Sequence, residues 1–194
     1  MAPPTLVLAS ASRYRREQLA RLGLAVTCDA PDIDEARLPA EAAPAMASRL
    51  ARAKAQAVSD RHPGAIIIAA DQVAARGEDI LGKPGSPGAQ RDQLLASSGL
   101  ELGFHSAVAV LDTRSGTLRE HLDLTRCRMR ELNPAEVERY VTTEPAGDCA
   151  GGFKVEGLGI TLFERIDSED PSALIGLPLI ALCRMLRAVG WELP

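Results

Sequence analysis

Two hydrophobic periods alternate along the chain, and each predicts a different kind of element. Short apolar runs, or runs in which apolar and polar residues alternate, are typical of strands, and apolar residues three or four apart are typical of helices. Strands are predicted over residues 5–9, 25–28, 65–70, 101–113, 118–129 and 160–166. Helices are predicted over residues 17–22, 44–60, 87–97 and 179–189, and from the capped start Asn133-Pro134-Ala135-Glu136. This alternation predicts an α/β fold.

Three of the predicted strands say more about the sheet. Residues 65–70 are all apolar, so this strand should be buried on both faces near the centre of the sheet. The strands over 101–113 and 118–129 are joined by the short turn at 114–116, so they should pair antiparallel. We therefore expect a mixed, partly antiparallel, twisted sheet flanked by helices.

Composition narrows the class of protein. With 194 residues, 46% of them hydrophobic, the chain is expected to form a single domain over residues 1–194 with a sizeable core. A net charge of −4 argues against a dedicated nucleic-acid binder but leaves room for a small polyanion held by local cations. The four cysteines lack CxxC spacing, which favours free thiols in a reducing cytoplasm. The N-terminus has no signal-peptide pattern and no apolar run is long enough to span a membrane, so a cytoplasmic protein is predicted.

The segment Ser10-Ala11-Ser12-Arg13-Tyr14-Arg15-Arg16 joins the first predicted strand to the first helix. Its three arginines lie in or near the first helical turn, where the helix dipole is already positive. Hydroxyls, free backbone N–H groups and guanidinium groups at such a place suit a phosphate. The alternative is a solvated basic helix start capped by Ser10 or Ser12. The segment alone leaves both interpretations open.

Four further residues could complete such a site. Asp71 follows the apolar run and should end its strand, where a partly desolvated carboxylate with a raised pKa suits a general base or a metal ligand. Glu35 belongs to the acidic stretch 32–35, and together with Asp71 it could hold Mg²⁺ beside substrate phosphates. Lys54 and Lys83 could each reach a phosphate. Taken singly, each residue also fits an ordinary role: a strand-end cap, a solvated acidic loop or a surface lysine.

Several motifs that would indicate other chemistry are absent from the sequence. There is no P-loop, no G-x-S-x-G elbow, no G-x-G-x-x-G, and no pair of histidines with the helical spacing of a zinc site. A kinase or a phosphatase with a phospho-acceptor nucleophile is therefore not favoured.

Four blocks together resemble the Maf family of nucleoside triphosphate pyrophosphatases. They are residues 8–16, residues 70–73 with Gly82-Lys83-Pro84, residues 148–157 and residues 175–179, and they occur in order along nearly the whole chain. The runs at 153–160 and 174–183 are most similar to the branch described as 7-methyl-GTP pyrophosphatase.

The resemblance implies a function, a shape and a set of site residues. It implies hydrolysis of a nucleoside triphosphate to the monophosphate and pyrophosphate with a divalent metal, Mg²⁺ or Mn²⁺, in a protein with two lobes around a deep cleft. It implies Asp71 as proton acceptor, Glu35 and Asp71 as metal ligands, and Ser10, Arg15, Lys54 and Lys83 around the phosphates. Tyr14, Gln72 and Glu156 match positions assigned to base specificity. Homodimers are common in such proteins, and no nucleic acid or membrane partner is implied.

Two departures from the family pattern stand out. Arg13 replaces the usual proline, which bears on how the phosphate loop is braced. The family commonly has Tyr/His-x-Thr-Gly near the middle of the chain, and here residues 104–107 read Phe-His-Ser-Ala, which leaves the role of that stretch open. Two other functions also stay open: a dTTP/UTP pyrophosphatase of the same family, and a nucleotide-sensing regulator of cell division in which hydrolysis is secondary.

Overall fold

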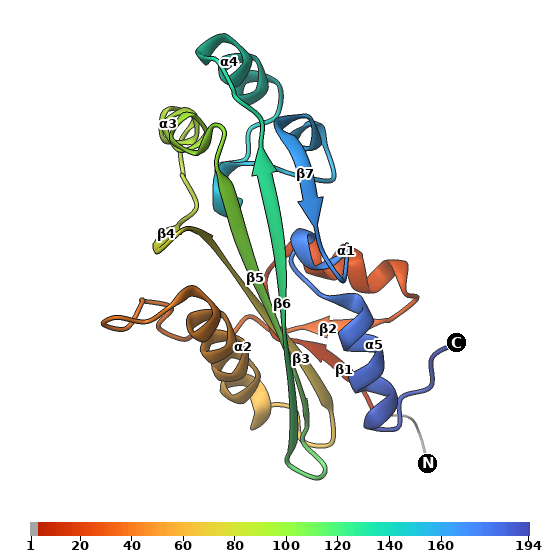
Figure 1. Cartoon of the computed structure of the whole chain (residues 1–194). Helices are drawn as coiled ribbons and strands as arrows, with labels where there is room; N and C mark the ends of the chain where they lie inside the picture. Colours follow the sequence, from red (N-terminus) through yellow and green to blue (C-terminus); the bar gives the residue numbers. More distant parts are fainter. Residues whose placement is uncertain (1–3) are drawn as a thin grey trace.

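A seven-stranded sheet runs through the computed structural model, which describes residues 4–194 (Figure 1). The strands are β1 (Leu6–Leu8), β2 (Val26–Cys28), β3 (Ile66–Arg76), β4 (Asp79–Leu81), β5 (Glu101–Asp112), β6 (Thr117–Met129) and β7 (Phe163–Asp167). The helices are α1 (Arg13–Arg21), α2 (Ala43–Ser59), α3 (Pro87–Ser97), α4 (Pro134–Thr143) and α5 (Leu179–Ala188), with short 3₁₀ segments η1 (Ala150–Gly152), η2 (Leu158–Leu162) and η3 (Ala173–Ile175). The stretch Met1–Pro4, on which the signal-peptide prediction rests, lies almost wholly outside the described residues.

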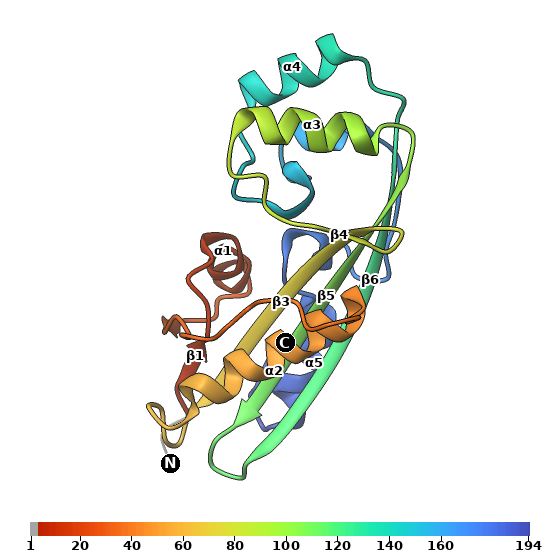
Figure 2. The same ribbon diagram turned by 90° about the vertical axis from the view of Figure 1, so that its left-hand side faces the viewer.

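The sheet is mixed, as predicted. Its strand order is β2-β1-β3-β5-β6-β7, with β4 paired to β3. Strand β1 pairs in parallel with both β2 and β3, whereas β3, β5, β6 and β7 pair antiparallel in turn. The parallel part is short because β1 has three residues, and the long strands β3, β5 and β6 continue beyond it. Figure 2 shows these strands reaching from the end near α2 to the end near α3 and α4.

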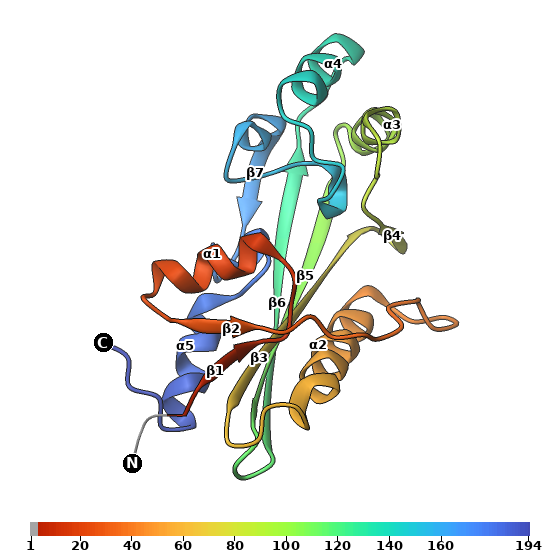
Figure 3. The ribbon, with the colours of Figure 1, turned by 180° about the vertical axis from the view of Figure 1, so that it is seen from behind.

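Helices cover both faces of the central strands (Figure 3). Ile66 and Ile68 of β3 pack with residues of α1 and α5 on one face, while Ile67 between them packs against α2 on the other. This alternation follows from the period of two in a strand and confirms that the apolar run is buried on both sides. A third cluster, which includes Phe104 and Met129, lies at the far end of the long strands with α4. Among residues 4–194, no helix combines the length and the apolar character needed to cross a membrane.

Two strand predictions need correction. The strand predicted at 160–166 begins only at Phe163, because residues 158–162 form η2, which the Glu144 carboxylate holds by accepting hydrogen bonds from the N–H groups of Leu158 (3.2 Å) and Gly159 (3.1 Å). The strand predicted to end near Asp71 continues to Arg76, because β5 pairs with it as far as Ala75 and β4 pairs with its last residues. Asp71 therefore lies inside β3 rather than at its end.

Candidate active site

Two adjoining cavities bring the predicted site residues together. The larger, about 710 Å³, is lined by the predicted phosphate and metal residues Ser10, Arg15, Glu35, Lys54, Asp71 and Lys83. The smaller, about 140 Å³, contains Glu156. The residues that line both cavities include Tyr14, Arg15, Gln72 and Lys83. All nine predicted residues thus lie around one continuous region, although they come from segments spread over most of the sequence.

The end of β1 creates this region. Pairing between β1 and β3 stops at Leu8 and Ile68, and the chain then turns through Ser10 towards α1. The edge of β3 is left without a β1 partner beyond that point, where Asp71 and Gln72 follow. Because successive strand residues point to opposite faces, Asp71 faces α2 and Gln72 faces η3. Asp71 thus lies at the cavity because the neighbouring parallel strand β1 ends before it, and not because its own strand β3 ends there.

A buried ion pair occupies the α2 side of the larger cavity. The ammonium nitrogen Nζ of Lys54 lies 2.6 Å from Asp71 Oδ1 and 2.8 Å from Glu35 Oε1. Lys54 and Asp71 are 6% and 7% exposed, so the interpretation of Lys54 as a surface lysine is wrong. Burial raises the pKa of Asp71, and the charges of Lys54 and Arg15 offset part of that rise. Lys83, in contrast, is exposed in the turn after β4.

Of the three arginines in the basic segment 10–16, Arg15 is the one that lines both cavities. Its Nε donates to the Gly176 carbonyl oxygen at 3.0 Å and its Nη1 donates to Ser10 Oγ at 3.4 Å. Burial lowers the Arg15 pKa, but a guanidinium keeps its charge at any ordinary pH. Ser12 is the helix cap, accepting from the Arg15 N–H at 3.4 Å. Neither cavity is lined by Arg16, which is exposed.

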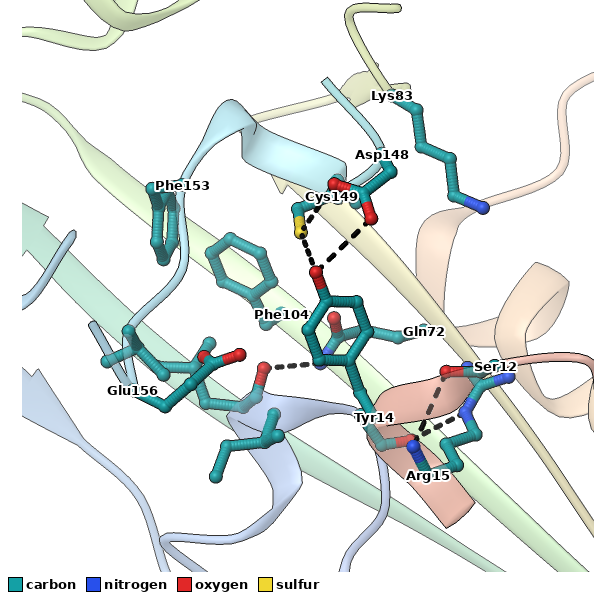
Figure 4. A pocket seen from close by; sticks show the side chains of 15 residues that line it. Ser12, Tyr14, Arg15, Gln72, Lys83, Phe104, Asp148, Cys149, Phe153 and Glu156 are labelled. Atoms are coloured by element: carbon teal, nitrogen blue, oxygen red, sulfur yellow. Dashed lines mark hydrogen bonds between the residues drawn. The ribbon is translucent and has the colours of Figure 1, made fainter. Parts of the chain in front are cut away.

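Arg13, the first departure from the family pattern, contacts Tyr14 and also lines the larger cavity. Arg13 is the first residue of α1, its Nη2 donates to Tyr14 Oη at 2.8 Å, and its guanidinium lies 4.7 Å from the centre of the Tyr14 ring. Tyr14 Oη in turn donates to Asp148 Oδ2 at 3.2 Å (Figure 4). Burial raises the Tyr14 pKa to about 12, so the hydroxyl keeps its proton.

Aromatic residues that sequence reasoning missed form a wall of the smaller cavity. Phe104 and Phe153 line it and pack edge to face with ring centres 5.3 Å apart. Gly151 makes this packing possible, because its φ of +81° is unfavourable for other residues and a Cβ there would lie 2.9 Å from Phe104. Asp148 and Cys149 line the same cavity. Two features of the sequence could have pointed to this wall: the pair Gly151-Gly152 and the rarity of phenylalanine, which occurs three times in the chain.

The carboxylates of Glu35 and Asp71 fit a divalent cation in part. Both lie within hydrogen-bond distance of one ammonium nitrogen, so their oxygens converge on one position, and carboxylate oxygens are the ligands that Mg²⁺ and Mn²⁺ prefer. Among residues 4–194, no group of three or more His, Cys, Asp or Glu is close enough to hold a metal ion. Any ion at this position therefore needs oxygens from a bound ligand or from water, and it competes with Lys54 for the same carboxylates.

Comparison with solved structures supports the fold. A HAM1 protein from Coxiella burnetii aligns with a TM-score of 0.53 over 96% of this chain and 100% of its own, at 17% sequence identity. The chain is thus an α/β protein with the mixed-sheet fold of that HAM1 protein, and at this identity the likeness concerns the fold alone.

Sequence comparison then defines the family. The model described as "Maf-like protein" matches residues 5–189, and the chain belongs to the Maf family. A Xanthomonas oryzae protein named 7-methyl-GTP pyrophosphatase is 52% identical over 98% of this chain and 100% of its own. A protein of the same name from Aromatoleum aromaticum is 51% identical over 97% of this chain and 97% of its own. Another, from Burkholderia pseudomallei, is 49% identical over 99% of this chain and 91% of its own.

Proposed function

We propose that this protein is a nucleoside triphosphate pyrophosphatase that hydrolyses 7-methyl-GTP to the monophosphate and pyrophosphate. The observation that carries the proposal is the continuous pair of cavities, in which cationic side chains and two carboxylates meet beside an aromatic, acidic pocket. The family membership and the names of relatives about half identical over nearly the full chain support the same reaction and the same base.

Asp71 is suited to accept a proton. Its Oδ1 accepts a hydrogen bond from Lys54, while Oδ2 has no hydrogen-bond partner within the described part of the chain. We assign Oδ2 to take a proton from the attacking water. The water oxygen forms a bond to the α-phosphorus, the bond from that phosphorus to the oxygen bridging to the β-phosphorus breaks, and pyrophosphate leaves with the electron pair. Burial of Asp71 suits this role, since it raises the carboxylate pKa and so makes the ionised carboxylate a stronger proton acceptor.

The cationic residues balance the charge of the phosphates. Arg15 is fixed by Gly176 and Ser10, so its guanidinium is held in place before the substrate binds. Lys54 and Lys83 both line the larger cavity and supply point charges there. Such fixed charges lower the barrier because they need no rearrangement as charge develops. Glu35 and Asp71 would hold a Mg²⁺ or Mn²⁺ ion, which when bound would supply Lewis-acid stabilisation of the phosphoryl oxygens.

The smaller cavity suits a cationic purine. N7-methylation gives guanine a positive charge, and Tyr14 stacking would add about 0.5–2 kcal/mol of cation–π attraction. Arg13 lies over one face of the Tyr14 ring, so the base takes the other face. The Glu156 carboxylate accepts hydrogen bonds from the guanine N1–H and N2–H₂ groups, and its charge favours the methylated base over guanine itself.

A pyrophosphate-release assay with 7-methyl-GTP, GTP, dTTP and UTP at equal concentration tests both the reaction and the base. We expect 7-methyl-GTP to be the best substrate and Asp71→Asn to lower kcat by about 10²–10⁴-fold. The control is Asp32→Asn, which alters an exposed carboxylate in the loop of Glu35 that lines neither cavity. Preference for UTP would support the dTTP/UTP alternative, and binding without turnover would support a nucleotide sensor. Near-normal turnover by Asp71→Asn would overturn the assignment of the base.

The proposed activity also carries expectations about the setting of the protein. A nucleotide substrate and free thiols favour the cytoplasm, which fractionation of cells that express the tagged protein tests. Any homodimer should be visible by light scattering of the purified protein, and the nucleic-acid binding that we do not expect would appear as retention on a DNA or RNA column.

A further inference from the structure

A row of polar side chains crosses three strands beneath η3. Gln72 on β3 is opposite Ser106 on β5, which is opposite Asp123 on β6, so the three side chains share one face of the sheet. Ser106 is fully buried, although it belongs to the stretch 104–107 whose role the sequence left open.

The hydrogen bonds of this row determine how the Gln72 amide is oriented. Gln72 Nε2 lies 2.9 Å from Ser106 Oγ, 2.9 Å from the Ala173 carbonyl oxygen and 3.1 Å from the Leu174 carbonyl oxygen. Backbone carbonyls only accept hydrogen bonds. Ser106 donates its one hydrogen to the Ala173 oxygen at 2.8 Å, so towards Gln72 it can only accept as well. Three acceptors surround this position, and only the NH₂ end of the amide can occupy it.

The amide oxygen of Gln72 must then face the other way. Among residues 4–194 it has no hydrogen-bond partner, and Gln72 lines both cavities. Figure 4 shows this oxygen on the side of the amide away from the dashed hydrogen bond and towards Phe104. The Glu156 carboxylate lines the same pocket. The pocket therefore offers oxygen acceptors from two directions.

We infer that Ser106 is a positioning residue for base selection: it helps to fix the Gln72 amide so that its oxygen, like the Glu156 carboxylate, accepts hydrogen bonds from the bound base. The inference rests on the proposed function and deepens it. A pocket of acceptors favours a base edge with adjacent N–H donors, as in guanine N1–H and N2–H₂. It disfavours the uracil edge, where one N–H lies between two carbonyl oxygens.

Ser106→Thr and Ser106→Val form a matched pair, because threonine and valine have nearly the same shape and only threonine keeps the hydroxyl. The selectivity to measure is the ratio of kcat/KM for 7-methyl-GTP to that for UTP. We expect Ser106→Thr to keep the wild-type ratio and Ser106→Val to lower it by about 2–10-fold, mainly through KM for 7-methyl-GTP, as loss of one hydrogen bond would. In a Gln72→Met background, Ser106→Val should lower the ratio no further.

A second readout is independent of turnover. Exchange of the Gln72 side-chain NH₂ protons with solvent, followed by ¹⁵N NMR, should be slow in the wild type and Ser106→Thr and about 10-fold faster in Ser106→Val. If the valine variant fails to fold, Ser106→Ala makes the same comparison without added volume. The inference would be overturned if Ser106→Val lowered kcat/KM equally for 7-methyl-GTP and UTP and left the Gln72 exchange rate unchanged. It would also be overturned if Ser106→Val lowered the ratio as much in the Gln72→Met background as in the wild type. If the wild type hydrolyses no nucleotide, the proposed function fails while the exchange rates still decide whether Ser106 orients Gln72.

Discussion

The contact between Lys54 and the two carboxylates governs the acid–base behaviour of the site. A buried carboxylate favours its protonated form, and a neighbouring ammonium opposes that tendency. Asp71 experiences both, with burial as the larger influence and Lys54 as the largest opposing one. Lys54 therefore serves two purposes in the proposed reaction. It keeps Asp71 ionised and able to accept a proton, and it supplies positive charge to the phosphates.

Removing this ammonium should shift the pH dependence of turnover. In Lys54→Met the Asp71 pKa rises further, and because the base acts only when deprotonated, activity is lost at a higher pH as the solution is acidified. We expect the acidic limb of the kcat/KM profile for 7-methyl-GTP to move upward by about 1–3 pH units. The matched control is Arg52→Met on the same helix, since Arg52 is exposed and pairs with Glu120 away from the cavities. An unshifted acidic limb would contradict Asp71 as the base.

At the scale of single elements, the start of α4 is determined by local sequence. Asn133 Oδ1 accepts from the Glu136 N–H at 3.0 Å, and the Glu136 carboxylate accepts from the Asn133 N–H at 2.9 Å. This reciprocal pair satisfies two donors that a helix leaves free at its N-terminus, and Pro134 needs none. The helix packs at the end of the long strands with α3, and none of its residues lines either cavity.

A substitution at the cap residue Asn133 should therefore change stability without changing activity. Asn133→Ala should lower the free energy of unfolding, measured with urea, by about 0.5–2 kcal/mol. Asn133→Asp keeps an acceptor oxygen at the cap and should remain close to the wild type. Hydrolysis of 7-methyl-GTP should be unchanged in both variants at a temperature where both are folded. A stability of Asn133→Ala equal to that of the wild type would mean that the capping interactions contribute nothing measurable.

Elements set by local patterns were predictable, and contacts between distant segments were not. The capped start of α4, the apolar run of β3 and the β5–β6 hairpin can be recognised because their signals lie within a few neighbouring residues. The continuation of β3 past Asp71 depends on pairing with β5, and η2 depends on Glu144. The family resemblance predicted residues that the fold brings together around the two cavities, whereas neither burial of Lys54 nor the inferred role of Ser106 follows from residue types alone.

Across the whole molecule, one segment connects the two ends of the site. The segment 172–177 contains η3, and side chains from three elements donate hydrogen bonds to its backbone carbonyls. Gln72 and Ser106 bind its first part at Ala173 and Leu174. Arg15 binds the Gly176 oxygen, and Gln18 binds the oxygens of Ser172 and Leu177. The residue proposed to bind phosphate thus helps to hold the same backbone that orients the proposed base-recognition amide.

This shared segment predicts that a change at the phosphate end alters base selection. Arg15→Lys keeps the positive charge, but an ammonium cannot reproduce the planar arrangement that reaches Gly176 and Ser10 at once. We expect KM to rise about 10-fold for every nucleotide, and in addition the preference for 7-methyl-GTP over UTP should fall about 2–5-fold because η3 is held less firmly. Lys83→Ala is the matched control, since Lys83 lines both cavities and is exposed in the turn after β4. It should weaken both nucleotides equally. If Arg15→Lys, like Lys83→Ala, leaves the preference for 7-methyl-GTP over UTP unchanged, the phosphate end and the base end of the site act independently. The segment 172–177 then lines the site without coupling the two ends.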